Sequence, residues 1–390
     1  MTARRGFLRS ACRWCAGLGG LGFAGLAASQ DLAPAALPPR FARPPAETDE
    51  GGLWALMDRE EQRLRRSPFV VRDDRLTRYL EGVVCRLGAD HCIDVRVHVV
   101  RNPLFNASMA PNGMMQVWSG LLLRMENEAQ LAAVLGHELG HYLERHSVER
   151  LRDSRSRAAF AQLMGVFGIA GTVAQWGIMA GMFSFTREQE ARADRLGLGL
   201  MLRAGYDPAQ AARVWDNLLG ELKVTGGEDA GTRSPLFATH PPPANRRDEL
   251  TRLAGARGGE AAEPGLRQVV APHRMEWLEA EVRRGQWEES LVLLDRMVAR
   301  DPLDAQACFA RGEVYRQRDA QGDTARSLDD LVAATALPGP PVQAFRSLGL
   351  LRQRLGDKPG SAAAFRRYLA RAPEAIDAGL IRSYLAELAS

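Results

Sequence analysis

The chain has 390 residues, with 51 basic and 47 acidic side chains, and is too long for one ordinary hydrophobic core. Its first 29 residues hold four arginines and no acidic residue, so the remainder is close to neutral. This balance excludes a basic surface for nucleic acid, and no nucleic-acid partner is expected.

The first segment, residues 1–29, has the features of an export signal. Arg4 and Arg5 stand in a pattern close to the twin-arginine signal, and a short, glycine-rich apolar stretch follows. Small residues favour cleavage near Ser29, which predicts a periplasmic protein. An uncleaved membrane anchor is the alternative. A lipid anchor is not expected, because Cys12 and Cys15 lack the apolar residues of a lipoprotein cleavage site.

Five prolines predict a linker over residues 30–52. Amphipathic patterns predict helices over 51–65 and 73–87, and alternating apolar residues predict strands over 93–100 and 114–118. The strand 114–118 is our candidate for an edge strand that binds an extended substrate, with an ordinary core strand as the alternative.

The cysteines agree with an oxidising compartment. Cys85 and Cys92 flank a short connection between a helix end and a strand start, so we expect them to form a disulfide bond. Cys308 is left over and is expected to pack as a small apolar residue.

The most informative motif is HELGH, with His137, Glu138 and His141 in an expected helix. Two histidines four residues apart differ by only about 40° around a helix, so both imidazoles can reach one metal ion. A glutamate between them is typical of zinc hydrolases, in which it acts as general base. Such a short motif also occurs by chance, but here it lies on a regular apolar stripe. That stripe consists of Leu131, Val134, Leu135, Leu139 and Leu143.

The third zinc ligand is not expected from the same helix. His146 follows His137 by nine residues, about 180° around a continuous helix, so it should point away and serve as a capped or hydrogen-bonded histidine. Glu190 and Asp194 share one face of a later expected helix. Glu190 can bind zinc there, while Asp194 accepts the N–H of a ligating histidine.

These residues resemble a known family. HELGH together with TREQEARAD is similar to the zinc metallopeptidases that include the CAAX prenyl proteases and the Oma-type mitochondrial peptidases. A third segment, from Thr239 to Arg246, is similar to the family's His-Pro element with an arginine six residues after the histidine. The resemblance implies one zinc ion with Glu190 as its third ligand, and it adds His240 and Arg246 to the site.

Within this family, His240 has two alternative roles. It can donate a hydrogen bond to the oxyanion of the tetrahedral intermediate. Or, as the resemblance to bacterial periplasmic members implies, it can take the fourth zinc position and make the enzyme latent. An ordinary loop histidine before a proline turn is the third alternative.

Residues 158–184 form a second long apolar stretch, which is long enough to span a bilayer. Five glycines and several polar residues dilute it, so a pair of helices near the site is favoured, as a lid or a peripheral membrane contact.

After a linker over 255–272, residues 273–390 repeat a helix-pair pattern with a period near 34. Pro302, Pro338 and Pro373 mark this period, and the pattern resembles tetratricopeptide repeats with a concave face for a protein partner. A plain helical bundle is the alternative.

The predicted fold is mainly α with a small β-sheet: a gluzincin-type metallopeptidase domain over 53–254, followed by the repeat domain. The residues predict a zinc metalloendopeptidase with a protein-binding module. The resemblance to periplasmic peptidases that carry a repeat domain implies misfolded or stalled exported proteins as substrates, and the outer-membrane assembly machinery as partner. A chaperone or scaffold with a structural, closed zinc site is the alternative function.

Overall fold

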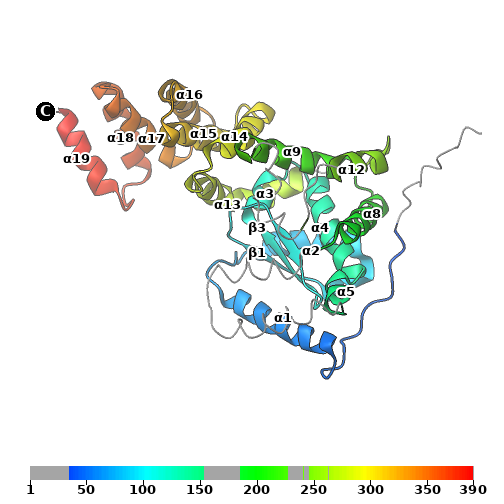
Figure 1. Cartoon of the computed structure of the whole chain (residues 1–390). Coiled ribbons are helices and arrows are strands. Elements are labelled where there is room, and N and C mark those ends of the chain that lie inside the picture. The colour runs from blue at the N-terminus through cyan, green and yellow to red at the C-terminus, as the bar shows by residue number, and fades with distance from the viewer. Residues whose placement is uncertain (1–34, 153–184, 227–239, 241–245, 262, 390) are drawn as a thin grey trace, which may run out of the picture. The chain divides into compact units, whose positions relative to one another are not determined.

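A computed structural model of the chain describes residues 35–152, 185–226, 240, 246–261 and 263–389 (Figure 1). The predictions on 1–29 and 158–184 lie outside these residues. Within them the chain is mainly helical with one three-stranded sheet, which confirms the predicted fold class. The first helices are α1 (Asp49–Arg66), α2 (Asp74–Gly88), α3 (Ser119–Arg124), α4 (Glu128–Leu143), α5 (His146–Arg152), α8 (Arg187–Arg203), α9 (Ala209–Gly226) and α12 (Arg246–Ala254).

The sheet has the order β1-β3-β2, with β1 (Arg96–Val100) parallel and β2 (Ala107–Met109) antiparallel to β3 (Met114–Trp118). The strand predicted over 114–118 is therefore present but central and fully buried, so its assignment as an edge is wrong. The edge beside it is β2, a strand of three residues. The strand predicted over 93–100 begins only at Arg96, because Ala89–Asp94 forms a 3-10 helix.

Helices α4 and α8 pack closely and lie side by side (Figure 1). Small residues permit this approach: a Cβ atom added to Gly140 would lie 2.8 Å from the carbonyl oxygen of Ala193, and one added to Gly197 would lie 2.9 Å from the backbone nitrogen of His137. Any larger side chain would push the helices apart.

Side-chain caps set where both helices begin. The Asn127 side chain accepts from the Gln130 N–H at the start of α4, and Thr186 and Gln189 form a capping box at the start of α8. The two helices therefore have defined starts as well as a defined separation.

The segment before α1, within the linker expected over 30–52, contacts the rest of the chain. The Ala35 N–H donates to the Gly199 carbonyl oxygen at 3.2 Å, and the Phe41 ring lies edge-on to Tyr142. The structure also contains the predicted Cys85–Cys92 disulfide bond, and Cys308 is buried as expected.

The helices that follow are α13 (Glu263–Arg283), α14 (Trp287–Arg300), α15 (Ala305–Arg318), α16 (Asp323–Ala336), α17 (Val342–Arg354), α18 (Lys358–Arg371) and α19 (Ala378–Ala389). Helix α13 thus begins inside the linker expected over 255–272. The reason is packing, since Leu266, Val269 and Val270 are all buried. Residues before it are also held, because Gly205 and Asp207 exchange backbone hydrogen bonds with Glu260.

The same kind of contact joins the two helices within each of two successive helix pairs. The Ser327 hydroxyl of α16 donates to the Gly312 carbonyl of α15 at 2.9 Å, and the Ser361 hydroxyl of α18 donates to the Gly349 carbonyl of α17 at 2.8 Å. The two serines are 34 residues apart, which matches the expected period. Among the residues that the structure describes, no helix combines the length and apolar character needed to cross a bilayer.

Candidate metal centre

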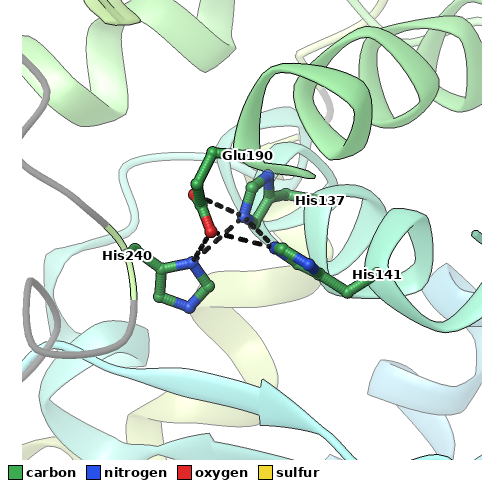
Figure 2. A group of neighbouring side chains, drawn as sticks. All are labelled: His137, His141, Glu190 and His240. Carbon is green, nitrogen blue, oxygen red and sulfur yellow. Dashed lines mark hydrogen bonds and ion pairs between the residues drawn. The ribbon is translucent and has the colours of Figure 1, made fainter. Parts of the chain in front are cut away.

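Four side chains from separate parts of the chain meet in one buried cluster (Figure 2). His137 and His141 come from α4, Glu190 from α8 and His240 from between α9 and α12, and one ligand atom of each lies within 4.8 Å of the others. The His137 and His141 Nε2 atoms are 3.0 Å apart, and Glu190 Oε1 lies 3.3 Å from His141 Nε2 and 2.8 Å from His240 Nδ1. The structure thus brings together the four residues that the sequence proposed as zinc ligands.

The outward nitrogen atoms of the histidine pair have partners of their own. His137 Nδ1 lies 2.8 Å from Asp194 Oδ1, and His141 Nδ1 lies 2.9 Å from His146 Nδ1. If each ligand histidine carries its proton on Nδ1, it donates to this partner and keeps an Nε2 lone pair for an ion. The partners are therefore compatible with the tautomer that can bind a metal.

The expectation that His146 points away from the pair is wrong. It assumed a continuous helix, but α4 ends at Leu143 and Arg145 has a φ of 57°, so α5 starts in a new direction. His146 is fully buried, as a hydrogen-bonded histidine should be, but its bond is to a proposed ligand.

We expect His146→Ala to weaken zinc binding about 10- to 100-fold, because His141 loses the acceptor that orients its ring. Competition with a chromophoric chelator measures the affinity. His98→Ala is the matched control, since His98 pairs with Glu61 in the sheet region. Equal zinc affinity in the two variants would contradict a positioning role for His146.

A second contact to the pair was not anticipated from the sequence. The Phe185 ring stacks on His141, with ring centroids 3.8 Å apart and planes at 22°. Phe185 directly precedes Thr186, the N-cap of α8. Because α8 carries the proposed ligand Glu190, a residue just before its start can lie near the metal cluster, and this was the sequence feature that could have predicted the contact.

Arg246 joins Glu190 and Asp194, two of the carboxylates of α8. Its guanidinium donates to Asp194 at 2.6 and 2.7 Å and lies 3.1 Å from Glu190 Oε2, while its face covers the Trp215 ring at 4.1 Å. The charges are buried together. Burial acts to raise the pKa of Glu190, but His240 and Arg246 hold it well below its usual value.

These residues fit a zinc ion. Two histidines, a carboxylate and a third histidine form a donor set that zinc prefers. The cluster also attracts a cation: although burial and Arg246 act against it, Asp194 and Glu190 raise the pKa of His137 to about 9. Glu190 Oε2 is buried and accepts no hydrogen bond from the described residues, although Arg246 Nη1 lies 3.1 Å away, so its lone pairs are available to a metal ion.

Glu138 lies on the same helix beside the cluster. Its side chain is buried, and burial raises the pKa of its carboxyl group, which suits a group that both accepts and returns a proton. Its Oε1 atom is 3.7 Å from Nε2 of His240, the opposite edge of the ring from Nδ1. His240 therefore lies between Glu190 and Glu138.

Comparison with known proteins agrees with this geometry. The chain is 28% identical over 280 residues to the β-barrel assembly-enhancing protease of Escherichia coli K12, covering 67% of this chain and 52% of that protein. It is 34% identical over 179 residues to the mitochondrial metalloendopeptidase OMA1 of Arabidopsis thaliana, covering 46% and 35%. The chain thus spans about half the length of the bacterial relative.

The family comparison covers the segment that holds every residue of the cluster. Residues 71–254 match the model of peptidase family M48. The match runs from before β1 to the end of α12, and it includes HELGH, Glu190, Asp194, His240 and Arg246. This match agrees with the resemblance of residues 71–254 to the zinc metallopeptidases that the motifs implied, and it identifies the similar family as peptidase family M48.

Proposed function

We propose that this protein is a zinc-dependent endopeptidase of the periplasm that hydrolyses misfolded or stalled exported proteins. The observation that carries the proposal is the convergence of His137, His141 and Glu190 beside the buried carboxyl group of Glu138. The match of residues 71–254 to peptidase family M48 supports the same chemistry.

His137, His141 and Glu190 would hold one zinc ion. A bound zinc ion lowers the pKa of water and polarises the scissile carbonyl group. Glu138 takes the proton of the attacking water and passes it to the nitrogen of the leaving amine. Asp194 and His146 keep the ligand histidines in the required tautomer, and Arg246 neutralises the carboxylates of α8.

The substrate is proposed to bind in extended form along β2. Among the residues that the structure describes, this strand pairs in the sheet with β3 alone, which leaves its other edge for a substrate. Ala107 of β2 lines a cavity that also contains His137 and Glu138, which places this edge beside the cluster.

His240 is proposed to close the zinc site and make the enzyme latent. Its Nδ1 lies 2.8 Å from Glu190 Oε1 and 3.4 Å from His137 Nε2, within the ligand cluster (Figure 2). Hydrolysis needs an open or exchangeable coordination position, so His240 must move away for substrate. Permanent closure would favour the second candidate function, a periplasmic scaffold with a structural zinc site.

The cellular role is proposed from the relatives and from the signal. One relative is named for enhancing β-barrel assembly, which suggests outer-membrane proteins as substrates and their assembly machinery as the partner of helices α13 to α19. The recurring serine–glycine contact supports a tetratricopeptide-like arrangement there. Residues 1–29 are proposed to direct twin-arginine export with cleavage near Ser29, and 158–184 to touch the membrane peripherally.

Zinc analysis combined with casein hydrolysis by wild type and His240→Ala tests the proposal. We expect about one zinc ion per chain in both proteins. We also expect about tenfold faster hydrolysis by the variant, if the capped state holds roughly nine molecules in ten. Removal of the metal by a chelator should abolish both activities, and added zinc should restore them.

The outcomes separate the two candidate functions and the two roles of His240. A variant as slow as wild type, or slower, overturns the cap and favours the oxyanion role. Full zinc content with no hydrolysis by either protein favours the scaffold.

A further inference from the structure

A small cavity lies beside the catalytic cluster, and no catalytic step uses it. Its volume is about 30 Å³ with His240 in the position that the structure shows, and Glu138, His137 and His240 form part of its wall. The rest of the wall comes from α4, α8, α9, α12 and the residues around β2. Its apolar lining includes Ala133, Val134, Met201, Val214, Trp215 and Leu250.

Apart from the cluster residues Glu138, His137 and His240, the charged side chains that line the cavity are Asp194 and Arg246. These two are paired with each other at 2.6 Å, so neither is free to pair with a charge on a ligand. A charged or strongly polar ligand group would lose its hydration there without a compensating partner. An aliphatic group would gain from burial.

The position of the cavity next to Glu138 places it on the leaving-amine side of the scissile bond. If Glu138 returns its proton to the leaving amine, the residue that carries this amine must lie against Glu138. The side chain of that residue is then the nearest substrate group to the cavity. This step depends on the proposed peptidase function.

The volume limits what can enter. A single water-sized group needs about 10 to 15 Å³ by the same measure, so the cavity takes two or three such groups. That is the size of a valine or leucine side chain, whereas a phenyl or indole ring is too large. We propose that this cavity is a specificity pocket for a small aliphatic side chain on the residue that becomes the new amino terminus.

Two residues of α4 allow a test without a large loss of core packing. Ala133 and Val134 are only half-buried, so their side chains border the cavity and not the centre of the core. Ala133→Leu should fill the cavity, and Val134→Ala should enlarge it. Val298→Ala, a half-buried position on α14, is the matched control.

The first measurement is sequencing of the new amino termini in a casein digest by mass spectrometry. Wild type and Val298→Ala should yield mainly alanine, valine and leucine. Ala133→Leu should reduce the share of valine and leucine about tenfold, and Val134→Ala should admit phenylalanine. Cleavage with no preference, or with the same preference in all four proteins, overturns the pocket and leaves the peptidase function intact.

The second measurement does not depend on turnover. Zinc-loaded Glu138→Gln is titrated calorimetrically with the dipeptides Val-Ala, Phe-Ala and Asp-Ala, whose amino termini imitate a cleavage product. We expect Val-Ala to bind about tenfold tighter than the other two, and Val134→Ala in the same background to remove the difference from Phe-Ala. Equal affinities overturn the pocket. The expected order of affinities, combined with wild type and His240→Ala proteins that hydrolyse no casein, supports the pocket and counts against the peptidase function.

Discussion

Glu138→Gln is expected to leave the zinc content of the protein unchanged and to lower peptide hydrolysis by about two to four orders of magnitude. Glutamine keeps the size of the side chain but cannot accept a proton from water. The four proposed ligands come from other residues, so metal binding does not depend on the Glu138 carboxyl group. Casein hydrolysis with metal analysis of the same sample measures both quantities.

If the wild type is latent, it has little activity for the substitution to remove. Glu138→Gln should therefore also be made in the His240→Ala protein, and the activity of the double variant compared with that of His240→Ala. Glu126→Gln is a suitable control, because Glu126 lies just before α4 and pairs with Arg296, not with the cluster. Activity that persists in zinc-replete Glu138→Gln would remove this residue from the mechanism.

Arg246→Gln is expected to have the largest effect on stability. Its guanidinium is the cation that Asp194 and Glu190 share, and all three side chains are buried. Removing one member of such a network leaves uncompensated charge, which costs about 3 to 5 kcal/mol of unfolding free energy. The loss should be smaller in the presence of zinc, because the metal supplies positive charge to the same cluster.

Urea unfolding with and without zinc measures this prediction. Arg247→Gln is the matched control. Arg247, the next residue in the chain, pairs with Asp216 and Asp248 on the surface, where ion pairs contribute little to stability. If both variants unfold at the same urea concentration, the buried network does not hold α12 to α8.

The sequence predicted the parts of the site that depend on helical spacing. His137 and His141 at four residues, and Glu190 and Asp194 at four residues, lie on single helix faces, and the structure brings both pairs to one point. The order of two helices and two strands before the motif was also predictable, because their apolar patterns have a clear period.

The failures arise where periodicity carries no information. His146 was misplaced because one residue with a positive φ, Arg145, redirects the chain after α4. The edge strand was missed because β2 has three residues between Pro103 and Pro111, too few to show alternation. The start of α13 was missed because the glycines before Glu263 suggested a linker, whereas burial against the core decided the outcome.

The contact between α4 and α8 changes what counts as part of the metal site. Gly140 and Ala193 bind nothing, yet their separation fixes how far Glu190 stands from the two histidines. A methyl group added at Gly140 would alter the ligand geometry as surely as the loss of a ligand. Gly140 of HELGH therefore helps to determine the geometry of the metal ligands, although it provides no ligand itself.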